Sequence, residues 1–190
     1  NGIGSQPAVT FDGAGSFLID EDGNNYINGL SDFNLIAVVQ SSSDNINTNN
    51  GFFNTGDLDD GTDADDGIEM RYDSDGYEGD GTEVIKVGVH TTDGNTAYES
   101  DNFTQSENPQ ILSTDWSSGK AIDLFINGTG DSPTWKGSSA GGLLDNATQV
   151  VLGRGARDNE NSSWDGKIAE VLLYANNLDS ASRTIIENYL

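Results

Sequence analysis

The chain has 190 residues, a formal net charge of −24 and no cysteine. This charge excludes general affinity for nucleic acid, which requires Lys and Arg against phosphate, and it disfavours binding to anionic membranes. The length suits one domain with a real core, the lack of cysteine excludes a disulfide framework, and no apolar run is long enough for membrane insertion.

Short apolar runs separated by clusters of Gly, Asn, Asp and Ser predict strands along most of the chain. In chain order the predicted strands are Ala8–Asp12, Ser16–Ile19, Phe33–Gln40, Gly51–Thr55, Ile68–Tyr72, Val84–His90, Ala97–Thr104, Ala121–Asn127, Gln149–Gly153 and Lys167–Tyr174. Phe33–Gln40 and Lys167–Tyr174 are the most apolar, so we expect them to be central. Many short antiparallel strands predict an all-β fold, a two-sheet jelly-roll sandwich.

The end of the chain predicts one short helix, Ser180 to Leu190. Asn176 and Asn177 interrupt the last strand, and Asp179 is a suitable N-cap residue. We expect the helix to pack through the face that carries its apolar residues. These residues are Ala181, Ile185, Ile186, Tyr189 and Leu190. Trp164, just before the last strand, is expected to pack in the core or under this helix.

Several segments, in this order, resemble the laminin-G-like, concanavalin A-like lectin-glucanase jelly-roll domains of bacterial surface and secreted proteins. The segments are Gln6–Gly13 with Ser16–Leu18, Phe33–Val39, Ile122–Gly128 after Trp116, Val151–Gly153, and Gly166–Tyr174 with Leu178-Asp179. The resemblance covers essentially the whole chain. It implies a single domain, 1–190, which the start at Asn1 suggests is cut from a larger protein. Members of the family bind glycans or proteins, frequently hold calcium, and are mostly non-catalytic.

An acid-rich loop from Asp57 to Gly67 is the first predicted calcium site. Its carboxylates are Asp57, Asp59, Asp60, Asp63, Asp65 and Asp66. So many acids in one short loop repel each other unless water or a cation bridges them, and Ca²⁺ accepts six to eight oxygens in irregular loops. The spacing is not that of an EF-hand. A solvated acidic loop is the alternative.

Two further acidic segments are weaker candidates. One begins at Asp73 and contains Asp75, and the other is Asp20–Asn25. Asp-Gly pairs are also common in tight β-hairpin turns, so a plain turn is the alternative in both segments. Without a His or Cys cluster, a zinc site is not expected.

Aromatic and Arg side chains are the predicted ligand contacts, because sugar rings stack on aromatic faces and Arg binds carboxylates with two hydrogen bonds. The candidates are Trp135, Tyr77, Arg157 and Trp116. Trp116 could instead pack in the core, and Arg157 could pair with an acid inside the protein. Arg71, on a predicted strand, is expected to form such an internal pair.

No catalytic motif stands out in the sequence. The β-glucanases of this fold carry Glu-x-Asp-x-x-Glu on one strand. Glu78, Asp80 and Glu83 have that spacing, but Gly79 and Gly81 between them are typical of a turn, and the predicted strand Val84–His90 begins only after them. We therefore predict a non-catalytic, calcium-stabilised, extracellular module for glycan binding or adhesion. It is expected to be monomeric and joined to neighbouring domains. A polysaccharide-degrading enzyme or its accessory domain, and a structural spacer without a ligand, are the alternatives.

Overall fold

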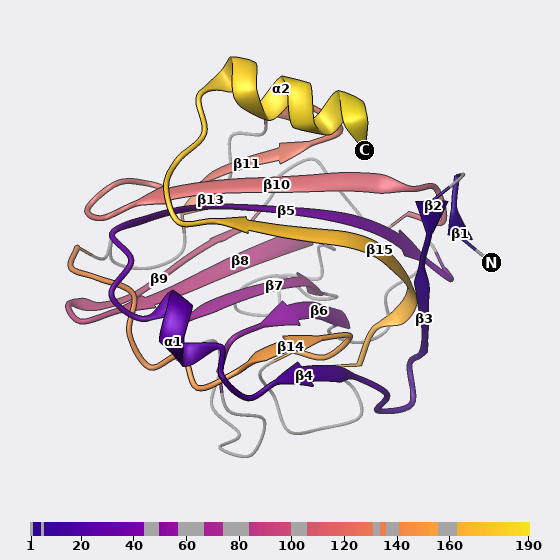
Figure 1. Cartoon of the computed structure of the whole chain (residues 1–190), viewed down its shortest axis with the longest axis horizontal. Coiled ribbons are helices and arrows are strands. Elements are labelled where there is room, and N and C mark those ends of the chain that lie inside the picture. The colour runs from indigo at the N-terminus through magenta and orange to yellow at the C-terminus, as the bar shows by residue number, and fades with distance from the viewer. Residues whose placement is uncertain are drawn as a thin grey trace.

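The structure is a computed structural model that describes residues 2–4, 6–43, 50–56, 67–73, 84–99, 106–130, 134–135, 141–155 and 163–190, with the backbone alone for 95–99 and 134–135. Two antiparallel sheets pack face to face, and the C-terminal helix lies outside the sandwich (Figure 1). This is the predicted all-β jelly-roll sandwich with a short C-terminal helix. No helix in the described part of the chain is long and apolar enough to cross a membrane.

The first sheet has six strands. In spatial order they are β12 (Thr129–Gly130), β11 (Asp123–Ile126), β10 (Gln110–Ser117), β5 (Asp32–Ser41), β15 (Asp165–Tyr174) and β3 (Val9–Asp12). The two most apolar strands, β5 and β15, pair antiparallel at the interior of this sheet, as predicted. β5 is buried along most of its length, as expected for an apolar strand between two neighbours, whereas most of β15 is half-buried.

The second sheet has seven strands. In spatial order they are β13 (Thr134–Trp135), β9 (Gly94–Glu99), β8 (Val84–Thr91), β7 (Ile68–Asp73), β6 (Asn50–Asn54), β14 (Val150–Leu152) and β4 (Leu18–Asp20). The remaining elements are the small hairpin of β1 (Gly2–Ile3) and β2 (Gln6–Pro7), the short helix α1 (Asn24–Ile27), and α2 (Ser180–Tyr189).

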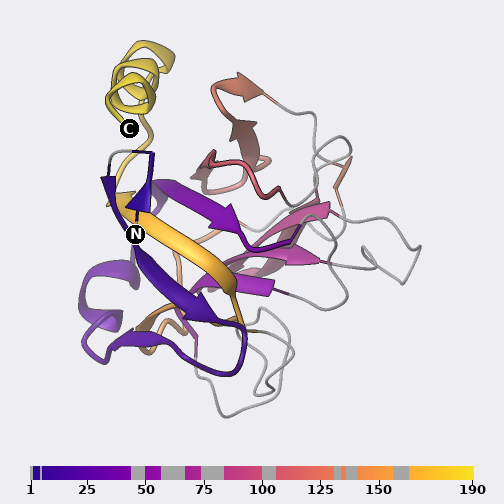
Figure 2. The same ribbon diagram turned by 90° about the vertical axis from the view of Figure 1, so that its right-hand side faces the viewer.

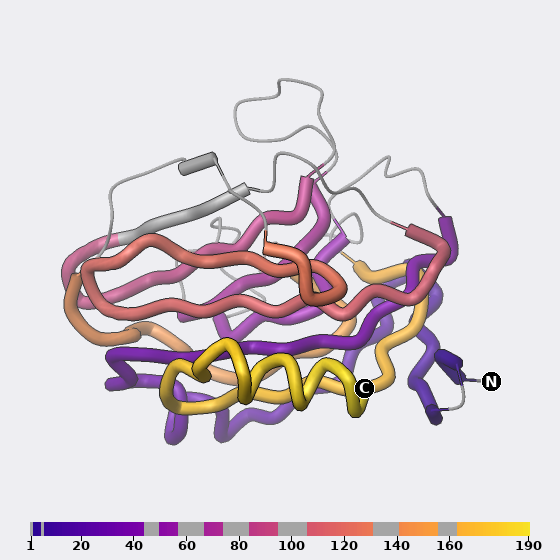
Figure 3. Tube along the Cα trace, turned by 90° about the horizontal axis from the view of Figure 1, so that it is seen from above, coloured from indigo at the N-terminus to yellow at the C-terminus, as the bar shows by residue number. Residues whose placement is uncertain are grey.

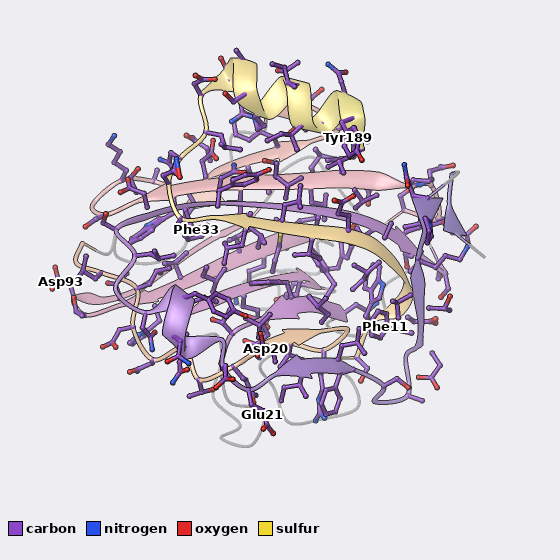
Figure 4. All side chains as sticks on the ribbon, in the orientation of Figure 1. Phe11, Asp20, Glu21, Phe33, Asp93 and Tyr189 are labelled. Carbon is purple, nitrogen blue, oxygen red and sulfur yellow. The ribbon has the colours of Figure 1, made fainter. Side chains whose placement is uncertain are left out.

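The hydrophobic core lies between the two sheets. Trp164 is fully buried there and stacks on Tyr72 of β7 with 5.7 Å between ring centroids, as its predicted core position requires. Phe52 meets the edge of the same indole at 5.6 Å. Phe33 and Phe11 occupy the sandwich from the six-stranded side (Figure 4). These aromatic contacts fix the relative position of the sheets.

Strand β10 was not predicted from the sequence. Leu112, Thr114 and Trp116 face the core and are buried, whereas Ser113 and Asp115 face the opposite side. This alternation is that of a strand, but the polar residues on both faces obscured it. Its neighbour β11 lies within the predicted strand Ala121–Asn127.

Helix α2 lies along the outer face of the six-stranded sheet (Figures 1 and 3). Figure 2 shows the helix end-on above that sheet. The predicted packing face was partly wrong. Ile186 and Leu190 are half-buried, but Ile185 and Tyr189 are 71% and 77% exposed. The half-buried side of the helix instead includes Arg183 and Glu187, because the sheet beneath it presents an acid, Asp115.

Candidate functional site

A row of charged side chains lies on the outer face of the seven-stranded sheet. It comes from β7, which is buried along its full length. Met70 and Tyr72 belong to the core, so Glu69, Arg71 and Asp73 lie on the opposite face, because side chains alternate along a strand.

Arg71 holds both acids of this row. Its Nη1 lies 3.1 Å from Oε2 of Glu69, and its Nη2 lies 2.9 Å from Oδ2 of Asp73. All three side chains are at most 4% exposed. Lys86 of β8 stands directly opposite Arg71 and is also buried. Arg71 therefore compensates part of the cost of burying the two carboxylates. The prediction that Arg71 forms an internal pair is confirmed.

A polar groove opens at one end of the six-stranded sheet, where β3, β15 and β5 run side by side. We call it the Lys167 groove. It has a volume of about 330 Å³. Its lining residues are Thr10, Phe11, Gln40, Ser41, Ser42, Glu107, Asp165, Gly166 and Lys167. In Figure 4, Phe11 marks this end of the sandwich beside β3.

Main-chain hydrogen bonds hold the two walls of the groove in place. The Ser41 amide donates to the Ser106 carbonyl at 3.1 Å, and the Ser42 amide donates to the Asp165 carbonyl at 3.0 Å. The Gln40 side chain donates from Nε2 to the Glu107 carbonyl at 2.8 Å. These bonds tie β5 to β15 on one side and to the turn before β10 on the other.

Most of the predicted site residues lie outside the described residues. These are Asp57, Asp59, Asp60, Asp63, Asp65, Asp66, Asp75, Tyr77 and Arg157. The described parts of the chain hold no group of three or more His, Cys, Asp or Glu side chains that could bind a metal ion. Asp73 is described, and its carboxylate is the partner of Arg71. The predicted calcium site stays a prediction.

Of the predicted ligand contacts, Trp135 and Trp116 fall in the described backbone. Trp135 lies in β13 and pairs with Tyr98 at the edge of the seven-stranded sheet. The assignment of Trp116 to the ligand site was wrong. Its side chain is fully buried, with 5.8 Å between its centroid and that of Phe33, so no sugar ring can stack on it.

Lys167, Gln40 and Glu69 are not among the site residues that the sequence predicts. Each belongs to or adjoins an apolar strand, and an apolar strand predicts core. One signal was available: Lys167 is one of only 8 basic residues in this very acidic chain. A base at the start of a central strand therefore indicates a local function for its charge.

No protein-family model matches the sequence, and no curated protein matches it. Its fold, however, is similar to that of solved structures. One is the CBM40 module of the Ruminococcus gnavus IT-sialidase bound to α2,3-sialyllactose, with 11% identity, a TM-score of 0.67, and coverage of 96% of this chain and 97% of that chain.

Two other similar structures extend this comparison. The native heptameric SAP-like pentraxin from Limulus polyphemus has 14% identity and a TM-score of 0.63, over 91% of this chain and 77% of that chain. A botulinum neurotoxin type C structure, whose toxin interacts with two ganglioside molecules, has 11% identity and a TM-score of 0.62, over 91% of this chain and 39% of that chain. At these identities the likeness shows the jelly-roll fold alone.

Proposed function

We propose that this chain is a non-catalytic extracellular module that binds glycans or mediates adhesion. The observation that carries the proposal is the full-length fold match to a carbohydrate-binding module, which covers 96% of this chain and 97% of the module. The pentraxin and the toxin that interacts with gangliosides have the same fold. Fold alone does not fix function, so the site chemistry must agree with it.

The polar chemistry of the described surfaces supports a sugar ligand. Hydroxyl groups donate and accept hydrogen bonds, and they suit surfaces that mix amides, carboxylates and cations. The Lys167 groove offers this mixture in one place.

A non-catalytic role is proposed because glycosidases need two carboxylates that face one cleft at a fixed separation. The Glu-x-Asp-x-x-Glu spacing of the β-glucanases of this fold occurs at Glu78, Asp80 and Glu83, in a Gly-containing segment that the sequence predicts to precede a strand rather than to form one. In the described part of the chain, Glu69 and Asp73 do share a strand face, but both carboxylates are engaged by one Arg. Both carboxylates are also buried, at most 4% exposed, so they do not face an open cleft as a glycosidase pair must.

Calcium stabilisation is part of the proposal, with the ion held by acids of the loop Asp57 to Gly67, or at the weaker second candidate by the segment that begins at Asp73 and contains Asp75. Oxygen-rich, irregular loops suit Ca²⁺. Melting with and without EDTA tests this point, because a ligand that binds only the folded state raises the melting temperature. An unchanged melting temperature would argue against a structural ion. We further propose that the module is a monomer and is linked to neighbouring domains. Sedimentation of the isolated module tests whether it is a monomer.

A glycan array probed with the module in the presence of Ca²⁺ tests the function. Trp135→Ala should weaken binding if the edge at β13 contacts sugar. Tyr189→Ala is the matched control, because Tyr189 is a 77% exposed aromatic residue on α2, over the other sheet. A blank array would favour the spacer alternative, and release of reducing ends from a polysaccharide would favour the enzyme.

A further inference from the structure

The Lys167 groove is built from two cross-strand rows of polar side chains. Thr10, Lys167 and Gln40 are direct neighbours across β3, β15 and β5. Residues opposite each other in a sheet share one face, and so do residues two apart in a strand. Asp165, two positions along β15 from Lys167, therefore lies on the same face, and its direct neighbour on β3 is Asp12. Ser42, just after the end of β5, lies beside Asp165 and donates its amide to the Asp165 carbonyl.

Gln40 is held in one orientation within the first row. Its Nε2 donates to the Glu107 carbonyl at 2.8 Å, which leaves Oε1 toward Lys167 at 3.4 Å from Nζ. The Lys167 ammonium also donates to the Gly2 carbonyl of β1 at 3.3 Å. The hairpin of β1 and β2 and the turn at Glu107 thus fix the polar groups before a ligand arrives, which reduces the entropy lost on binding.

Hydrogen-bonding capacity remains in the groove after these contacts. An ammonium has three donors, and both bonds made by Lys167 are long. Among the described residues no carboxylate forms an ion pair with Lys167, although the chain has a net charge of −24. Asp165 is exposed, and within the same described set its carboxylate accepts no hydrogen bond. A donor and an acceptor therefore stand in neighbouring rows without strong partners.

From this geometry we infer that the Lys167 groove binds a neutral saccharide unit. Lys167 and Gln40 donate to sugar oxygens, and Asp165 accepts from a sugar hydroxyl. This inference rests on the proposed function and places a sugar site on the six-stranded sheet, away from Trp135 in β13. The volume of about 330 Å³ is at the small end of the range of ligand pockets, roughly 300–1,000 Å³. It therefore suits a short saccharide rather than a long polymer.

The charge around the groove favours a neutral sugar over an acidic one. Lys167 is the one cation among the lining residues, and Glu107 and Asp165 are two acids. The field of a chain with net charge −24 also repels anions. Binding of a neutral sugar by hydrogen bonds should depend little on ionic strength, whereas binding of an acidic sugar through Lys167 should weaken with salt.

Titration followed by ¹H–¹⁵N NMR tests the inference on the whole module. The neutral probes are lactose, maltose and cellobiose, and sialyllactose is the acidic probe. We expect at least one neutral probe to shift the side-chain amide signal of Gln40. Lys167→Met should raise the dissociation constant of that probe about tenfold, the loss of affinity expected for one hydrogen bond from a charged donor. Lys120→Met is the matched control, because Lys120 is an exposed lysine after β10, and it should bind as the wild type does.

A second variant keeps the test valid if loss of Lys167 unfolds the hairpin. Thr10→Tyr fills the groove from an exposed position on β3 and leaves Lys167 in place. It should abolish the Gln40 shift while the melting temperature is retained. Glycan binding that persists in both folded variants, or no Gln40 shift with any neutral probe, would overturn this inference and leave the proposed function standing. If sialyllactose is the one probe that binds, and if salt weakens its binding, the inference that the ligand is a neutral sugar would be wrong. A blank glycan array for the wild type would overturn both proposals.

Discussion

Arg183 of α2 donates a hydrogen bond from Nη1 to Oδ2 of Asp115 on β10 at 2.6 Å. The same guanidinium lies over the ring of Phe125 on β11, 3.4 Å from its centroid, and its Nε lies 3.9 Å from Oε1 of Glu187. Asn34 of β5 donates to the other oxygen of Asp115. One arginine therefore connects α2 to two strands of the six-stranded sheet and fixes the position of the helix on the outer face of that sheet.

Arg183→Met should destabilise the module by about 2 kcal/mol, because it breaks a mostly buried ion pair and removes a cation–π contact. The side chains of Arg183 and Asp115 are only 12% and 11% exposed, so Asp115 would lose its cation without gaining full hydration. Urea unfolding measures the loss. Lys120→Met removes an exposed charge and should change the free energy of unfolding by at most about 0.5 kcal/mol. Equal effects of the two changes would contradict the docking role of Arg183.

Two adjacent isoleucines test which side of α2 faces the sheet. Ile186 is half-buried and Ile185 is 71% exposed. Ile186→Ala should cost about 1–2 kcal/mol, below the range for a fully buried Ile, because only part of the side chain leaves the packed state. Ile185→Ala should cost at most about 0.5 kcal/mol. The two variants remove the same atoms from neighbouring positions, so differential scanning calorimetry compares them directly. A larger loss of stability from Ile185→Ala than from Ile186→Ala would show that α2 packs through the face expected from the sequence.

In the six-stranded sheet, apolar positions predict the central strands β5 and β15 correctly, because apolar runs are central there. The same pattern does not predict a buried ion pair between two elements. Asp115 on β10 and Arg183 on α2 are residue types that are usually exposed, and they are mostly buried here because they pair with each other.

The Lys167 groove could not be predicted from the sequence, because it depends on which strands pair and in what register. Thr10, Gln40 and Lys167 come from three strands that are far apart in the sequence, and the register of β3, β15 and β5 makes them neighbours. Periodicity predicts which face of a strand a residue occupies, but it carries no register between distant strands. The fold was therefore accessible from composition, pattern and resemblance, whereas the groove required the pairing of the strands.

The stability of the docked helix should respond to pH through Glu187. Burial raises the pKa of Glu187, with Asp115 adding to the rise and Arg183 opposing it. Burial also raises the pKa of Asp115, against the lowering effects of Asn34 and Arg183. A carboxyl group with a raised pKa in the folded state binds protons more tightly there than when unfolded. Its contribution to stability therefore increases as pH falls through the folded pKa, and it is lost as pH rises.

The comparison of wild type with Glu187→Gln isolates this effect. The difference between their free energies of unfolding should move in favour of the wild type as the pH falls from about 7 toward about 4.5, the ordinary pKa of the group. Lowered pKa values elsewhere, such as that of Asp179, whose carboxylate accepts hydrogen bonds from the Ser182 amide, are common to both proteins and cancel. A difference that moves the other way would show that attraction to Arg183 outweighs burial.

Gly166 should be intolerant of a side chain, because β15 and β5 approach closely there. A Cβ atom at Gly166 would lie 2.3 Å from the backbone oxygen of Gln40, and the backbone φ is +154°. Gly166→Ala should therefore cost about 3 kcal/mol, since β15 must move away from β5. Gly15→Ala is the matched control, because Gly15 has a φ of +95° and open space around it, so only about 1 kcal/mol of backbone strain is expected. Urea unfolding of both variants separates the cost of the steric clash from that of backbone strain. Equal losses in the free energy of unfolding would show that β15 and β5 can separate at Gly166 without penalty. Gly166 also lines the Lys167 groove, so a folded Gly166→Ala protein should show an altered Gln40 side-chain amide signal in the NMR spectrum.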